Sequence, residues 1–134
     1  MNIAADIINL RREKGLDPIG VGETYDTLIP WYQILLMMGL VETVYKDGEI
    51  QGFIEWIKID EIPADKYNVK IDISRIKTAP ILLVINCIAR DKETFKELKK
   101  RLAQREPYDQ VHPYTVWHRR GEAKNKFSIH RRVK

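Results

Sequence analysis

The sequence predicts an α+β fold in which helices pack on the faces of a single mixed, mainly antiparallel sheet. Three observations indicate this class. Asp47-Gly48, a dipeptide typical of tight hairpin turns, separates two strand-like runs at 40–46 and 49–60. The apolar run 80–85 indicates a further strand that is covered on both sides. Segments 2–14 and 92–106 carry apolar residues at helical spacing, as expected of helices that cover a sheet.

The first helix is predicted over residues 2–14. Ile3, Ile7 and Leu10 recur at i, i+4 and i+7, which places them in one apolar stripe, and Gly15 is a plausible stop. Three basic residues near its end suit the negative pole of the helix dipole: Arg11, Arg12 and Lys14.

A second helix is predicted to follow a loop that contains one proline and two glycines. Thr24 or Asp26 can cap this helix, which runs to Met38 and has Gly39 as its C′ residue. Apolar side chains cover most of its circumference, so we expect it to pack on more than one side.

The strand at 49–60 has apolar residues on both faces, which predicts a position inside the sheet. Residues 60–79 are mostly polar and form an excursion, with a short alternating segment at Val69, Ile71 and Ile73. Simple alternation along the strand gives two sets: Ile50, Ile54 and Trp56 on one face, and Phe53, Ile57 and Ile59 on the other.

After the strand "PILLVINCIA", Asp91 is a predicted N-cap for the helix at 92–106. The buried face of this helix is predicted to comprise Phe95, Leu98 and Leu102, and the helix must end before Pro107. Residues 114–120 and 126–133 then form two strands joined by a turn that contains Gly121. The whole chain, 1–134, is expected to be one domain with a basic C-terminal hairpin at 114–134.

Composition places the chain among ordinary globular proteins, with 44% apolar and 31% charged residues in 134. Its longest apolar run is far shorter than the ~20 residues of a membrane span, and the N-terminus does not resemble a secretory signal. Cys87 is the single cysteine, so no internal disulfide can form and a cytoplasmic location is expected.

Charge is distributed unevenly along the chain. The last 18 residues hold seven Lys and Arg and one Glu, a formal charge of +6. Because the whole protein carries +4, the first 116 residues carry −2. The basic ending permits contact with nucleic acid or with an anionic cofactor.

The order of elements resembles the GNAT acyltransferase superfamily, and in particular the short GNAT-like proteins of bacteriophages. The resemblance covers residues 24–106 and rests on the helices before the hairpin, on "YKDGEIQGFIEWIKI" and on "APILLVINCIARDKETFKELKKRLAQR". It implies transfer of an acyl group from acetyl-CoA to an amine. The backbone amides of four residues would then hold the cofactor: Cys87, Ile88, Ala89 and Arg90.

This chain departs from the family at the cofactor turn. The family carries an Arg/Gln-x-x-Gly-x-Gly/Ala pattern there, because helix amides must approach the pyrophosphate closely. Here the turn reads "CIARDKET", without glycine, and Asp91 and Glu93 bring negative charge that Arg90 and Lys92 partly offset. The family's first strand is also absent from the sequence pattern. Such a chain can keep the fold while having lost or rebuilt the acyl-CoA site, so the sequence leaves catalysis open.

For an active enzyme, Glu55 is the candidate general base and Tyr108 or Tyr114 the candidate acid. The alternative for Glu55 is a charge at a sheet edge or a partner for a nearby lysine. Cys87 is expected to be a buried small residue and not a nucleophile. His118 and His130 can approach each other across the terminal hairpin, but two imidazoles alone predict no metal site.

The basic hairpin supports a second hypothesis, a binding module without catalysis. Its cationic rim would bind the phosphates of nucleic acid or of a CoA-like cofactor, or a virion or host protein. The alternative is a solvated edge strand that charge protects from aggregation, and an exposed hairpin can also pair in a homodimer. Six residues form this rim: Arg119, Arg120, Lys124, Lys126, Arg131 and Arg132.

Overall fold

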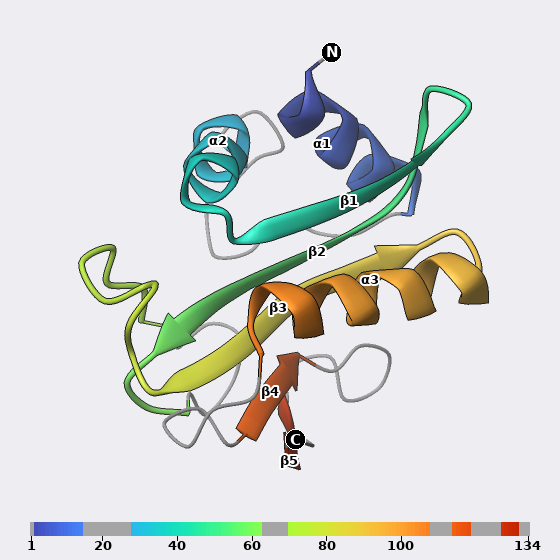
Figure 1. Cartoon of the computed structure of the whole chain (residues 1–134). Helices are drawn as coiled ribbons and strands as arrows, with labels where there is room; N and C mark the ends of the chain where they lie inside the picture. The colour runs from blue at the N-terminus through green and yellow to red at the C-terminus, as the bar shows by residue number, and fades with distance from the viewer. Residues whose placement is uncertain (1, 15–27, 63–69, 108–113, 119–126, 132–134) are drawn as a thin grey trace.

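The computed structural model describes residues 2–14, 28–62, 70–107, 114–118 and 127–131. The predicted α+β class is confirmed, because the described strands form one mixed sheet with helices on its faces (Figure 1). The elements are α1 (Ile3–Glu13), α2 (Leu28–Met38), β1 (Val41–Lys46), β2 (Glu49–Ile59), β3 (Ile81–Ala89), α3 (Lys92–Arg105), β4 (Tyr114–His118) and β5 (Phe127–Arg131).

The strands lie in the sequential order β1-β2-β3-β4-β5, so the hairpin β1–β2 is at one end of the sheet and the hairpin β4–β5 is at the other. Neighbouring strands are antiparallel except β3 and β4, which are parallel and joined through α3. Helices α1 and α2 cover one face of the sheet, and α3 covers the opposite face (Figure 1).

Capping fixes the ends of the helices. The Asn2 side chain accepts a hydrogen bond from the amide of Ala5, which starts α1. Gly39, with φ of +73°, ends α2: its amide donates to Leu36 O and the next amide, that of Leu40, donates to Leu35 O. This is a Schellman motif, which requires the left-handed conformation that glycine adopts without strain.

The predicted hairpin turn is confirmed, because Asp47 and Gly48 both have positive φ, 52° and 79°, as a type I′ turn requires. Simple alternation missed two irregularities of register. Tyr45 pairs with Ile50 while Val44 pairs with Gly52, so Gln51 is an extra residue in β2. Ile85 is likewise an extra residue in β3 opposite Glu55 and Trp56.

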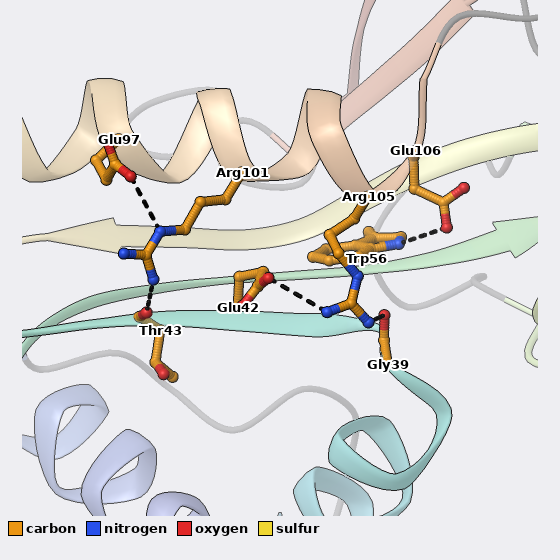
Figure 2. A network of polar contacts seen from close by, with 8 residues as sticks. All are labelled: Gly39, Glu42, Thr43, Trp56, Glu97, Arg101, Arg105 and Glu106. Carbon is orange, nitrogen blue, oxygen red and sulfur yellow. Dashed lines mark hydrogen bonds and ion pairs between the residues drawn. The ribbon is translucent and has the colours of Figure 1, made fainter.

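The core is centred on β2 and β3, whose side chains are buried on both faces as predicted. Phe53 faces α2, where it meets the Tyr32 ring edge to face at 6.0 Å. Trp56 is on the α3 face, and its Nε1 donates to Glu106 just after α3 (Figure 2).

One detail of α3 differs from the sequence prediction. Phe95 is not on the buried face of α3: it is exposed, and the ammonium group of Lys99 lies 4.7 Å from its ring centroid. Thr94 is buried in its place, together with Leu98 and Leu102.

The described part of the excursion at 60–79 forms turns, with Ile71 and Ile73 exposed. Ile76 is buried there, and its carbonyl accepts from the Lys58 amide.

Gly52 sets the distance between β2 and α3. A Cβ built on Gly52 would lie 2.5 Å from Ile88 O and 2.8 Å from Thr94 Cγ2. Since a backbone carbonyl cannot move without breaking the β2–β3 ladder, only glycine allows α3 to pack this closely.

We therefore expect Gly52→Ala to lower the free energy of unfolding by about 1–3 kcal/mol through overpacking. The measurement is urea denaturation followed by circular dichroism. Glu49→Ala, at an exposed position of the same strand, is the matched control and should change stability by less than about 0.5 kcal/mol. Equal stability of the two variants would contradict the close packing.

Candidate functional site

The Glu55 carboxylate lies in the interior, on the β2 face that α1 and α2 cover. The Tyr32 hydroxyl donates to Oε1 at 2.7 Å and Trp31 Nε1 donates to Oε2 at 3.2 Å. The side-chain amide of Asn86, on β3, donates to Oε1 as well. Glu55 therefore accepts hydrogen bonds from two elements that cover or flank β2.

Arg11 completes this buried network from α1. Its Nη1 lies 3.5 Å from Glu55 Oε1 and donates to the Tyr32 hydroxyl at 2.9 Å. The side chains of Arg11 and Glu55 are 1% and 0% exposed, so the charge pair is removed from water. Burying each ion costs several kcal/mol, which only close pairing and further hydrogen bonds can offset.

Tyr32 stays protonated inside this network. Burial, followed by the negative charge of Glu55, raises the pKa of the Tyr32 hydroxyl well above its ordinary value. The hydroxyl therefore accepts from Arg11 and donates to Glu55 without ionising at neutral pH.

The expected catalytic role of Glu55 finds no support in this geometry. Glu55 is 0% exposed, and among the described residues its carboxylate contacts Tyr32, Trp31, Asn86 and Arg11, so an amine cannot reach it in this conformation. The arrangement favours a structural role. Of the two candidate acids, Tyr108 lies outside the described residues, and Tyr114 is described only by its backbone, which pairs with that of Arg131.

The residues expected to hold the cofactor, Cys87, Ile88, Ala89 and Arg90, lie at the end of β3. Cys87, Ile88 and Ala89 pair with Ile54, Phe53 and Gly52 of β2, and the amide of Arg90 donates to Gln51 O at 2.9 Å.

The helix that begins after this turn is capped by its own aspartate. Asp91 Oδ1 accepts from the amide of Thr94 at 2.7 Å, and this hydrogen bond lowers the pKa of the Asp91 carboxyl. The cap puts a carboxylate where a phosphate would need a free amide. Arg90 is also engaged, because its Nε donates to Ile50 O and its Nη1 pairs with Glu13. These residues do not fit a CoA pyrophosphate in the described conformation.

Cys87 is half-buried and, as expected, unsuited to nucleophilic chemistry. Burial raises the pKa of its thiol from 9.0 to about 12, although the positive charge of Lys99 partly opposes this shift. Since the thiolate is the reactive species, little of it exists at neutral pH.

A concavity of about 440 Å³ lies between α1, the β1–β2 turn and Arg90. Its carboxylates are Asp6, Glu13 and Glu49, and Asp6 Oδ2 accepts from the hydroxyl of Tyr45 at 2.7 Å. That hydrogen bond, together with burial as the larger effect, raises the pKa of Tyr45. The negative lining next to the end of β3 further disfavours a phosphate at this position.

The basic candidates lie mostly outside the described residues: Arg119, Arg120, Lys124, Lys126 and Arg132. Arg131 is described as a backbone position at the end of β5, opposite Tyr114. The register also separates the two histidines of the hairpin. His118 is opposite Phe127 and His130 is opposite Thr115, so the two are not cross-strand neighbours.

Sequence reasoning missed the partners of Glu55. The basic character of Arg11 suits the helix dipole, but its position four residues after Ile7 continues the buried stripe. Asn86 interrupts an otherwise apolar strand, and a polar residue in such a run is a signal for a buried hydrogen bond.

Comparisons with protein-family models, with curated proteins and with solved structures gave no match. In the described part of the chain, no three His, Cys, Asp or Glu side chains are grouped to hold a metal ion. No described helix has both the length and the apolar character needed to cross a lipid bilayer.

The buried pair predicts strong coupling between Arg11 and Glu55. Arg11→Met or Glu55→Leu alone should cost about 3–5 kcal/mol, because each leaves one buried charge without its partner. The double variant should cost much less than the sum of the two. Urea denaturation of the four proteins measures the coupling free energy.

The control for this cycle is Lys70→Met, which removes the exposed pair Lys70–Glu61. We expect it to change stability by less than about 1 kcal/mol, as is usual for surface ion pairs. Strictly additive losses for Arg11→Met and Glu55→Leu would show that the pair is not a coupled unit.

Proposed function

We propose that this protein is a non-catalytic module with a GNAT-like fold that binds nucleic acid through its C-terminal basic hairpin. The observation that supports this most directly is the position of β5, the outermost strand at one end of the sheet. Among the basic residues of the hairpin, Arg131 lies in the paired strand β5, and Arg132 is the next residue in the sequence.

The distribution of charge supports a polyanionic partner. The last 18 residues carry +6 and the remaining 116 carry −2, so attraction to phosphates is concentrated at one end of the chain. Arginine forms bidentate hydrogen bonds with phosphate, and the hairpin supplies Arg119, Arg120, Arg131 and Arg132. A cytoplasmic location, where nucleic acid is accessible, belongs to this proposal.

Two features of the described residues, one buried and one at the start of α3, support the absence of catalysis. Glu55 is enclosed by Tyr32, Trp31, Asn86 and Arg11. The amide of Thr94 at the start of α3 is occupied by Asp91. A chain that uses these positions for packing and capping has neither an accessible base at Glu55 nor a free Thr94 amide for the acetyl-CoA pyrophosphate.

The proposal predicts salt-dependent binding that depends on the hairpin. A labelled DNA duplex and a labelled RNA strand, measured by fluorescence anisotropy, should bind more weakly as salt increases. Replacing Arg119, Arg120, Arg131 and Arg132 with Ala should weaken binding at least about tenfold. It should also reduce the slope of log K against log salt by about 0.9 for each duplex phosphate that the variant no longer neutralises.

The matched control changes the same amount of charge elsewhere, at Lys92, Lys96, Lys99 and Lys100, which are exposed on α3. Replacing these four lysines with Ala should leave most of the affinity. Equal losses of affinity in the two quadruple variants would show that binding depends on net charge alone and not on the hairpin. If the wild type binds neither DNA nor RNA, a virion or host protein is favoured as the partner.

A second candidate function, acyl transfer, is favoured by one observation. β4 pairs with β3 only at Leu82, Leu83 and Val84, so within the described residues β3 extends past its parallel neighbour from Ile85 to Ala89. A strand flank without a neighbouring strand can pair with amide groups of a ligand, and acyl-CoA contains such groups.

Thermal denaturation with millimolar acetyl-CoA distinguishes the two functions. Acyl transfer predicts a rise in Tm, because a ligand that binds the native state stabilises it, and the module predicts none. ATP serves as an anionic control, and the quadruple arginine variant removes any shift that comes from the basic hairpin. A rise that is specific for acetyl-CoA and survives in that variant would overturn the non-catalytic proposal.

A further inference from the structure

β1 is the outermost strand at the end of the sheet opposite β5. Such a strand turns alternate backbone groups away from the sheet, where they can pair with another chain. The Trp56 amide donates to Leu40 O, which sets the phase of this alternation. Glu42 and Val44 therefore turn their backbone groups toward β2, and Val41 and Thr43 turn theirs outward.

Two arginines of α3 reach the outer edge of β1 (Figure 2). Arg101 Nη1 donates to Thr43 O, and Arg105 Nη2 donates to Gly39 O at 3.0 Å. The two arginines are one helical turn apart, so both side chains leave α3 on the side of β1.

Each guanidinium is held in place by a carboxylate. Arg101 Nε donates to Glu97 at 3.1 Å, and Arg105 Nη1 donates to Glu42 at 3.3 Å. An arginine can bind a carboxylate and a carbonyl at once because its donors form a rigid, planar fork. The outward carbonyl of Thr43 in β1, and the carbonyl of Gly39 two residues before β1 begins, are therefore already bound by charged donors of the same chain.

The edge is complementary to itself. An antiparallel pairing of two β1 strands about Val44 sets Thr43 opposite the second copy's Tyr45, and both residues turn their backbone groups outward. The same register sets Glu42 opposite the second copy's Lys46, and symmetry repeats this pair of opposite charges. Lys46 is exposed, whereas Glu42 is engaged by Arg105 in the single chain.

We propose that Arg101 and Arg105 block the outer edge of β1. Without these two arginines, β1 would pair with β1 of a second copy of this chain. With both arginines in place, β1 cannot pair with a second copy, and the protein stays a monomer at this end of the sheet. This inference does not depend on the proposed function, because it concerns the end of the sheet opposite the basic hairpin.

The test is the oligomeric state of Arg101→Ala/Arg105→Ala, measured by size-exclusion chromatography with light scattering across the micromolar range. We expect the wild type to have the mass of one chain and the variant to have twice that mass at its highest concentrations. Lys99→Ala/Lys100→Ala removes the same charge from exposed positions of the same helix and should remain monomeric.

A third substitution tests the register. Glu42→Lys, added to the double variant, sets lysines opposite each other in the paired strands and should restore the monomer. A dimer that persists with Glu42→Lys would assign the contact to another surface, such as β5, and would overturn the proposal.

Arg101→Met/Arg105→Met keeps the apolar stems and the helix propensity of α3, so it guards against a double alanine variant that fails to fold. It should also dimerise, and circular dichroism should show a cooperative unfolding transition. A folded methionine variant that stays monomeric at every concentration contradicts the proposed edge.

Discussion

The buried pair between Arg11 and Glu55 is the constraint on which the arrangement of one face depends. Glu55 lies near the middle of β2 and receives its contacts from α1, α2 and β3. Since an unpaired buried charge is so costly, these elements are stable only when they are assembled together. Burial of apolar side chains favours any well-packed arrangement, whereas the carboxylate requires particular donors at particular positions.

On the opposite face of the sheet, the position of α3 depends on close packing against the strands and not on a buried charge. Gly52 lets α3 pack closely against β2, and Asp91 starts α3 immediately after β3. The two features together leave the turn between β3 and α3 occupied by its own hydrogen bonds. The physical need for a short, capped turn therefore competes with the need for free amides at an anion site, and in this chain the cap is present.

The two edge strands of the sheet also differ in the charged groups that lie beside them. At β1, Arg101 of α3 donates to the outward carbonyl of Thr43, and Arg105 donates to the carbonyl of Gly39 just before the strand. At β5, the sequence places an excess of positive charge on and around the last strand. Both edges are rich in positive charge, but in the described residues only the arginines at β1 are held by carboxylates of the same molecule. This contrast is why the proposed functions of the two ends differ.

The sequence by itself determined the class of fold, the α1, α3 and hairpin positions and the caps at Gly39 and Asp91. These are local properties, because turn dihedrals, helix periodicity and capping depend on residues within a few positions of one another. The tertiary structure decided the rest. It brought Arg11, Tyr32 and Asn86 to Glu55, exposed Phe95, and placed extra residues at Gln51 and Ile85. Each of these depends on which strand or helix lies beside a residue, and the separation of 44 positions between Arg11 and Glu55 leaves no local pattern to read.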